Sequence, residues 1–256
     1  MQDRFNKDNK QRENNDVIFG RNAVLEALRS ERPIDSVLIA AGERTGAINH
    51  IVALCREKGI TVKDVNPTKL DYMATGVGNH QGIAAYIAAY EYVSVEDILK
   101  NAEDKGEAPF IVILDEVEDP HNLGAVIRTA EASGVHGIII PKRRTATLTS
   151  AVSKASAGAL EYVPVAKVSN LASVIDELKE KNIWVYGADM NGQDFKKTDF
   201  SGGVALVIGN EGKGISRLIR EKCDVIVSIP MKGKINSLNA AVAAGILMTE
   251  VSCRRG

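Results

Sequence analysis

The second half of the chain alternates short apolar runs with longer amphipathic stretches, and this alternation restricts the fold more than any other feature of the sequence. The runs are rich in valine and isoleucine and are apolar at successive positions, as strands covered on both faces are. Such strands with helices between them form a parallel sheet that carries helices on both sides. We therefore predict an α/β domain. The predicted strands are 111–114, 137–140, 162–165, 183–186, 204–208 and 225–229, and the predicted helices are 121–133, 171–181, 215–221 and 237–252.

A weaker alternation in the first half predicts a separate, smaller α/β domain over residues 17–91. Its expected elements are helices at 21–29, 48–58 and 67–73 and strand-like runs at 36–40, 60–64 and 83–90. Residues 1–16 carry four basic and four acidic side chains and almost nothing apolar after Phe5. They cannot offset the entropy of ordering, so we predict a disordered tail. The acidic segment 92–108, which ends in KGEAP, is the natural linker to a second domain at 109–256.

Composition and residue spacing exclude several classes of protein. With 256 residues and 45% hydrophobic content, the chain can bury a sizeable core. No run of about 18 apolar residues could span a bilayer and the polar first residues show no secretory signal, so we expect a cytoplasmic protein. The cysteines form no CxxC pair and the histidines show no metal-ligand spacing, so neither a disulfide framework nor a metal site is expected. These residues are Cys55, Cys223, Cys253, His50, His80, His121 and His136.

The formal net charge of −1 hides an uneven distribution of charged residues. Ten acidic residues and only two lysines lie between Glu91 and Asp119, so the rest of the chain carries 30 basic and 23 acidic residues. That basic excess is enough for contacts with phosphate if it gathers on one face. Scattered lysine and arginine that only keep the surface hydrated explain the same count, so charge alone leaves the choice open.

Ligands of parallel α/β sheets bind beyond the carboxyl ends of the strands. In this chain those ends are the turns after Leu114, Tyr186, Ile208 and Ile229. The turn after Ile208 reads GNEGKGIS, but it is not a Walker phosphate loop, because Lys213 is followed by glycine instead of a magnesium-binding hydroxyl. The dinucleotide fingerprint GxGxxG is absent after the first strand, where NLGAV offers a single glycine. A nucleoside triphosphatase and a nicotinamide-dependent enzyme are therefore disfavoured.

Three segments at these turns together resemble the ordered motifs of the SpoU/TrmH RNA 2′-O-ribose methyltransferases of the SPOUT superfamily. The segments are NLGAVIRTAEASG at 122–134, VIGNEGKGIS at 207–216 and IPMKGKINSLNAAVAAGI at 229–246. Near the start, IFGRNAVLEALRS resembles the RNA-binding substrate domain of the RlmB-like branch, which modifies a guanosine of 23S ribosomal RNA. The resemblance implies S-adenosylmethionine-dependent methylation of a ribose 2′-hydroxyl in large-subunit ribosomal RNA, with transfer RNA as the rival substrate.

By the same resemblance, the sheet is Rossmann-like and its carboxyl-terminal part is threaded through a loop as a deep trefoil knot. The turns at 209–216 and 229–238 would belong to that knot, which binds the cofactor, and members of the family are homodimers. The predicted helix 237–252 has little polar face, which suits either a dimer interface or burial within one subunit. The positions that match the family's cofactor site are Gly187, Gly209, Ile229, Met231, Ser237 and Leu238.

The positions that match the family's catalytic residues are Asn122, Arg128, Glu211 and Asn239. Arg128 corresponds to an arginine often proposed as the general base. Lowering the pKa of a guanidinium from about 13.8 to about 7 would cost about 9 kcal/mol, so we favour a charged Arg128 that grips a phosphate and orients the ribose. Phosphate or solvent would then accept the proton. Simpler roles remain open: Arg128 as a surface side chain, and either asparagine as a helix cap.

A basic cluster follows the second predicted strand of the second domain, and we predict that it binds the RNA backbone. The cluster consists of Lys142, Arg143, Arg144 and, further on, Lys154. A hydrated charge run explains these residues almost equally well, and Arg21 and Asn22 of the small domain are weaker candidates. Two other classes stay open: a catalytically silent RNA-binding protein, and a small-molecule α/β enzyme, which is disfavoured because no nucleophile–base pair or metal set appears.

Overall fold

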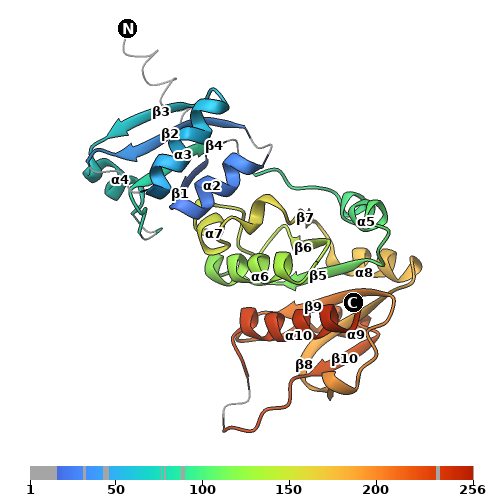
Figure 1. Cartoon of the computed structure of the whole chain (residues 1–256). Coiled ribbons are helices and arrows are strands. Elements are labelled where there is room, and N and C mark those ends of the chain that lie inside the picture. The colour runs from blue at the N-terminus through green and yellow to red at the C-terminus, as the bar shows by residue number, and fades with distance from the viewer. Residues whose placement is uncertain are drawn as a thin grey trace. The chain divides into compact units, whose positions relative to one another are not determined.

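The computed structural model divides the chain into two compact units (Figure 1). Unit 1 contains Met1–Glu91 and Leu148–Tyr162, and unit 2 contains Tyr92–Thr147 and Val163–Gly256. The structure describes residues 16–30, 33–42, 46–75, 77, 79–87, 90–234 and 237–255. The predicted disordered tail therefore lies outside the described residues, except for Asp16. Within the described part of the chain, no helix is long and apolar enough to cross a membrane.

Unit 1 is built on a four-stranded mixed sheet with the strand order β1-β4-β2-β3. Strand β4 runs antiparallel to both β1 and β2, and β2 pairs with β3 in parallel. Helices α2 and α3 bury apolar faces on one side of this sheet, where Val24, Ile51 and Ile83 meet in one core. The elements are β1 Asp16–Phe19, α2 Arg21–Arg29, β2 Ile34–Ala40, α3 Gly46–Glu57, β3 Thr61–Val65, α4 Pro67–Met73 and β4 Ile83–Ile87. The alternation predicted for the first half is confirmed.

Unit 1 also contains a segment from far along the chain, which comprises helix α7 (Ser150–Ala155) and the 3₁₀ turn η1 (Ala159–Glu161). The Tyr90 hydroxyl lies 2.6 Å from Glu161 Oε1, and the Tyr162 hydroxyl donates to Glu26 Oε2 at 2.5 Å. Gly158, with φ of 96°, lies so close to Glu26 that a Cβ there would come within 2.5 Å of its side chain. The segment 148–162 was assigned to the second domain from the sequence; in the structure it packs with the first.

Unit 2 contains a six-stranded sheet with the order β10-β8-β9-β5-β6-β7, in which every pair of neighbours is parallel. The parallel sheet predicted from the apolar runs is confirmed. Its strands are β5 Phe110–Asp115, β6 Gly137–Pro141, β7 Val165–Val168, β8 Ile183–Asp194, β9 Gly203–Gly209 and β10 Val225–Ser228. The strand predicted at 162–165 is displaced, because Tyr162 ends the segment that belongs to unit 1 and β7 begins only at Val165.

Helices cover both faces of the sheet. On one face, Ile98 of α5 (Val95–Asp104), Ile175 of α8 (Leu171–Glu180) and Ile219 of α9 (Arg217–Lys222) share a core with the strands. The other face carries α6 (Pro120–Ala132) and α10 (Ala240–Arg255), which pack against each other, and α10 also contacts β9. A short 3₁₀ turn, η2 (Phe195–Lys197), follows β8.

The segment predicted as a linker, 92–108, is mostly the helix α5. Ser94 and Asp97 form a capping box at its start, and Ile98 and Ala102 are buried. Ile98 packs so closely on β6 that a Cβ at Gly137 would lie 2.5 Å from its side chain. The linker interpretation was wrong on this point, because the acidic residues that suggested a solvated connection are only the exposed side of an amphipathic helix.

Candidate active site

A break in the strand pairing opens space at the carboxyl edge of the unit 2 sheet. The partner of Ile226 is Gly187, but the partner of Val227 is Gln193, so residues 188–192 have no partner in β10. Gly192 allows the two chains to close again, since a Cβ there would lie 2.5 Å from the carbonyl oxygen of Ile226. The unpaired residues 188–191 form one wall of a cavity of about 410 Å³.

This cofactor-sized cavity lies where the carboxyl ends of β8, β9 and β10 meet, as the rule for parallel sheets requires. Five of the six predicted cofactor positions line it, namely Gly209, Ile229, Met231, Ser237 and Leu238. Gly187 is not among the lining residues. Its missing side chain instead makes room for Cys223, whose Sγ would lie 2.8 Å from a Cβ at this position. Burial and the neighbouring Asp224 raise the pKa of the Cys223 thiol to about 12, so this thiol stays protonated beside the cavity.

The loop that follows β9 is fixed by hydrogen bonds to itself and to Glu116, the residue after β5. The backbones of Asn210 and Gly214 exchange two hydrogen bonds, of 3.1 and 2.8 Å. The Asn210 side chain accepts from the amides of Gly212 and Lys213, at 2.9 and 3.3 Å, and donates to the carbonyl of Glu116 at 3.0 Å. Asn210 was not predicted from the sequence, because an asparagine in a glycine-rich turn has no feature that reveals a partner 94 residues away.

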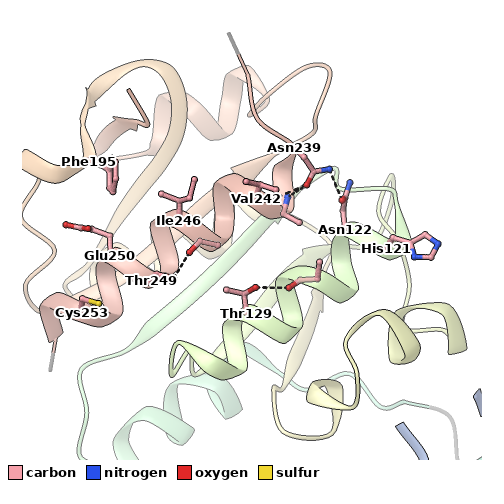
Figure 2. Close-up of a pocket in the computed structure, with 13 residues that line it drawn as sticks. His121, Asn122, Thr129, Phe195, Asn239, Val242, Ile246, Thr249, Glu250 and Cys253 are labelled. Carbon is pink, nitrogen blue, oxygen red and sulfur yellow. Dashed lines mark hydrogen bonds between the residues drawn. The ribbon is translucent and has the colours of Figure 1, made fainter. Parts of the chain in front are cut away.

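Three of the predicted catalytic residues form one hydrogen-bonded chain. Asn239 caps α10, with its Oδ1 accepting from the amides of Ala241 and Val242 at 2.9 and 3.3 Å. Its amide nitrogen then donates to Asn122 Oδ1 at 3.0 Å, and Figure 2 shows the two side chains pointing toward each other. The Asn122 nitrogen in turn donates to Glu211 Oε1. The amides at the start of α10 fix Asn239 Oδ1 as an acceptor, so the Asn239 nitrogen must face Asn122 Oδ1. The Asn122 nitrogen consequently faces Glu211, which accepts.

This chain of hydrogen bonds lies between two cavities. Glu211 lines the cavity at the sheet edge, whereas Asn122 and Asn239 line a second, open groove of about 850 Å³ between α6 and α10 (Figure 2). The groove is otherwise lined by residues of mixed character, among them Thr129, Val242 and Ile246. One residue from each of the three motifs, Asn122, Glu211 and Asn239, therefore takes part in this chain of hydrogen bonds.

Arg128 lies on α6 but lines neither cavity. Its side chain is exposed, and no hydrogen bond or ion pair to it is found among the described residues. It is therefore open to a ligand from outside the subunit. Its role as a phosphate contact stays a prediction.

The four predicted RNA-binding residues are divided between the two units. Lys142, Arg143 and Arg144 are exposed on the loop after β6 in unit 2, and Arg144 pairs with Glu116 at 2.8 Å. Lys154 belongs to unit 1, where its ammonium donates to the carbonyl of Asn79. Burial lowers the pKa of Lys154. Lys154 is thus held by its own unit, and its exposure is only partial.

The weaker RNA-binding candidate Arg21 has a structural partner, and so does His136, one of the histidines that show no metal-ligand spacing. Arg21 donates to the Gln81 carbonyl at 3.3 Å, within unit 1. His136 is fully buried; its Nδ1 accepts from the Phe110 amide at 2.9 Å, and burial lowers its pKa. Within the described residues, no group of three or more histidine, cysteine, aspartate or glutamate side chains is arranged to hold a metal ion.

Comparison with known proteins matches both halves of the chain to one kind of enzyme. The model described as "SpoU rRNA Methylase family" matches residues 109–249, and the model described as "RNA 2'-O ribose methyltransferase substrate binding" matches residues 17–93. YacO of Bacillus subtilis (strain 168), named for the TrmH family of tRNA/rRNA methyltransferases, is 51% identical over 94% of this chain and 96% of its own. A Staphylococcus aureus (strain MSSA476) protein of the same family name is 48% identical over 93% of this chain and 96% of its own.

A solved structure agrees with these matches. The SpoU methyltransferase AviRb from Streptomyces viridochromogenes, in complex with the cofactor AdoMet, superimposes with a TM-score of 0.80 at 25% identity, over 96% of this chain and 92% of that one. Fold, motifs and relatives together define an RNA methyltransferase. The chain belongs to the SpoU/TrmH methylase family. S-adenosylmethionine is its cofactor.

Proposed function

We propose that this enzyme methylates the 2′-hydroxyl of a ribose in RNA, at a guanosine of large-subunit ribosomal RNA. The observation that carries the proposal is the chain Asn239–Asn122–Glu211, which joins the cavity at the sheet edge to the open groove. A ribose hydroxyl held near this chain would lie between a cofactor and polar groups of fixed orientation. The match of residues 17–93 to a substrate-binding model of 2′-O-ribose methyltransferases supports the choice of the ribose.

The residues of the 410 Å³ cavity fit S-adenosylmethionine, which, when bound, supplies an electrophilic methyl group. Ile208, Ile229 and Leu238 offer apolar surface for a nucleoside base, and the loop backbone after β9 offers polar groups along one wall. The carboxylates of Asp189 and Glu211 also line the cavity and complement a positively charged cofactor. We assign cofactor binding to Gly209, Ile229, Met231, Ser237 and Leu238, with Gly187 shaping the packing behind them.

In the proposed mechanism, Arg128 stays charged, binds the phosphate next to the target ribose and orients the 2′-oxygen. Its planar, forked guanidinium suits bidentate phosphate binding, and its exposure on α6 leaves it accessible. Asn122 and Glu211 hold the ribose side of the site, and the proton passes to phosphate or solvent. Lys142, Arg143 and Arg144 contact the RNA backbone; their joint replacement by alanine should weaken RNA binding and reduce its dependence on salt.

We further propose that the loops after β9 and β10 form a trefoil knot and that two copies pair through α6 and α10. The described loop residues 209–214 and 229–234 line or adjoin the cavity that the knot would enclose. Support for pairing comes from the open groove between these helices and from Val242, a large apolar side chain on α10 that is 51% exposed. Sedimentation of the purified protein at micromolar concentration should give the mass of a dimer.

The decisive experiment is transfer of labelled methyl from S-adenosylmethionine to separated ribosomal and transfer RNA pools. Alkali-resistant dinucleotides would identify 2′-O-methylation, because the methyl group removes the nucleophile of alkaline cleavage. We expect label in the large-subunit ribosomal pool. Label only in the transfer RNA pool would show that transfer RNA, and not ribosomal RNA, is the substrate. Label in neither pool would refute ribose methylation of these RNAs.

A further inference from the structure

Two neighbouring loops of unit 2 each contain a non-glycine residue in the left-handed region. Glu116 follows β5 with φ of 60°, and Arg144 follows β6 with φ of 54°. This conformation is unfavourable for side chains other than glycine and persists where surrounding contacts hold it, often at functional sites. The two side chains meet, with Arg144 Nη1 lying 2.8 Å from Glu116 Oε1. The pair therefore joins the loop after β6, which carries Lys142, Arg143 and Arg144, to the loop between β5 and α6.

The backbone of Glu116 contacts the cofactor loop at the same time. Its carbonyl accepts from the Asn210 side chain at 3.0 Å, and Asn210 in turn holds the amides of Gly212 and Lys213. Residues 210–214 line the 410 Å³ cavity. A continuous path of three contacts thus runs from Arg144 through Glu116 and Asn210 to Gly212 or Lys213 in the cavity wall.

The exposure of the pair suits a contact with an outside ligand. The Arg144 side chain is 70% exposed, whereas that of Glu116 is 23% exposed. Within the described residues, Arg144 uses only Nη1, so the Nε and Nη2 edge of its guanidinium is left for a phosphate. Glu116 consequently orients the arginine without occupying the edge that binds anions most strongly.

We propose that Glu116 is a positioning residue that couples binding of an RNA phosphate at Arg144 to the loop that holds the cofactor. The proposal rests on the proposed function, because it takes RNA as the ligand of Arg144. A phosphate bound at Arg144 restrains the ion pair, which stabilises the left-handed conformation of Glu116 and thereby the hydrogen bond to Asn210. RNA and cofactor then each increase the affinity for the other by the same factor, as linkage requires.

The test measures the affinity for S-adenosylhomocysteine by calorimetry, with and without ribosomal RNA as the probe. We expect RNA to tighten its binding to the unaltered protein by about two- to fivefold, the range expected of one partly exposed ion pair. Glu116→Gln should abolish this factor. Glu116→Gly should also abolish it while retaining the loop, because glycine adopts the left-handed conformation without strain.

Matched variants separate coupling from simple loss of RNA binding. Arg143→Gln removes a neighbouring exposed charge and should weaken RNA binding but keep the coupling factor. Arg144→Gln should lose the factor, and the double variant with Glu116→Gln should lose no more than either single one. A coupling factor that is unchanged in Glu116→Gln, or absent from the unaltered protein, overturns the proposal. Intact coupling without methyl transfer to any RNA would instead refute only the proposed reaction.

Discussion

Gly209 is the position at which a single added carbon should most disturb the candidate site. A Cβ at Gly209 would lie 2.1 Å from the carbonyl carbon of Gly214, 2.3 Å from its oxygen and 2.2 Å from the amide nitrogen of Ile215. All three are backbone atoms, so no side-chain rotation can relieve the overlap. The loop must move, which breaks the two backbone hydrogen bonds between Asn210 and Gly214.

The expected cost of Gly209→Ala follows from these contacts. Two backbone hydrogen bonds contribute about 1 kcal/mol each, and forced overpacking costs about 1–3 kcal/mol, so the free energy of unfolding should fall by about 3–5 kcal/mol. At about 2–4 °C per kcal/mol, the melting temperature of the unit should fall by about 6–20 °C. Because the displaced loop lines the cavity, the affinity for S-adenosylhomocysteine should fall more than about tenfold, equivalent to about 1.4 kcal/mol.

The same loop supplies a matched control. A Cβ at Gly212 would meet only the Asn210 Oδ1 atom, at 3.5 Å, which is an ordinary van der Waals contact. Gly212→Ala should therefore melt within about 2 °C of the unaltered protein and bind the cofactor product almost as well. Thermal melting and calorimetry on both variants decide the matter. Equal damage by the two substitutions, or near-normal binding by Gly209→Ala, would refute the steric reasoning.

Three further predictions concern the catalytic chain, the arginine and a buried histidine. Asn122→Asp removes the donor to Glu211 and adds a like charge, so kcat/KM should fall at least about 100-fold, and a fall below tenfold in steady-state kinetics would contradict this role. Arg128→Lys keeps the charge but loses the planar fork and should also lose about 100-fold in turnover; near-normal turnover would sink the orienting role. Burial lowers the pKa of His136 below its ordinary 6.5, so its contribution to stability is complete above that pH and is lost as the pH falls toward the folded-state pKa. The free energy of unfolding, measured in urea, should therefore fall more steeply between about pH 7.5 and 5 for the unaltered protein than for His136→Gln. Identical pH dependence of the two proteins would show that His136 does not titrate in this way.

The regular elements were predictable where burial imposes a simple residue pattern. The strands of unit 2 are covered on both faces, which requires successive apolar residues such as those of β5 and β9. Helix α4 was predicted with its observed bounds, because Asn66 caps it and Pro67 begins it. These signals are local, so they survive without knowledge of the tertiary structure.

Features that depend on distant contacts could not be read from the sequence. The five residues of β8 without a partner in β10 are enclosed where Gly192 closely approaches Ile226, and their sequence, ADMNG, has no pattern that reveals this contact. Likewise, the place of 148–162 in unit 1 depends on Tyr162 and Glu26, which are 136 residues apart. Helix α5 was missed for a different reason: its many acidic side chains masked a short apolar stripe.

The sequence predicted which residues belong to the candidate site, but not the hydrogen bonds that connect them. The motifs located Asn122, Glu211 and Asn239, and the structure joins them by hydrogen bonds. The sequence did not indicate Asn210 or Glu116, whose roles rest on a side chain reaching a backbone carbonyl and on a left-handed loop residue. Residue types at motif positions can be matched one by one, whereas contacts between loops require the fold.

Residues 148–162 belong to unit 1 although they interrupt the sequence of unit 2, and this has a consequence for protein engineering and for recombination between relatives. Neither unit is a continuous stretch of chain, since the backbone passes between them after Glu91, after Thr147 and after Tyr162. A fragment that begins at Tyr92 would keep residues 148–162 but lose their partners, among them Tyr90, which bonds to Ser153, and Glu26, which bonds to Tyr162. Grafting the substrate-binding half of another family member onto this enzyme should therefore succeed only when residues 148–162 are exchanged with it.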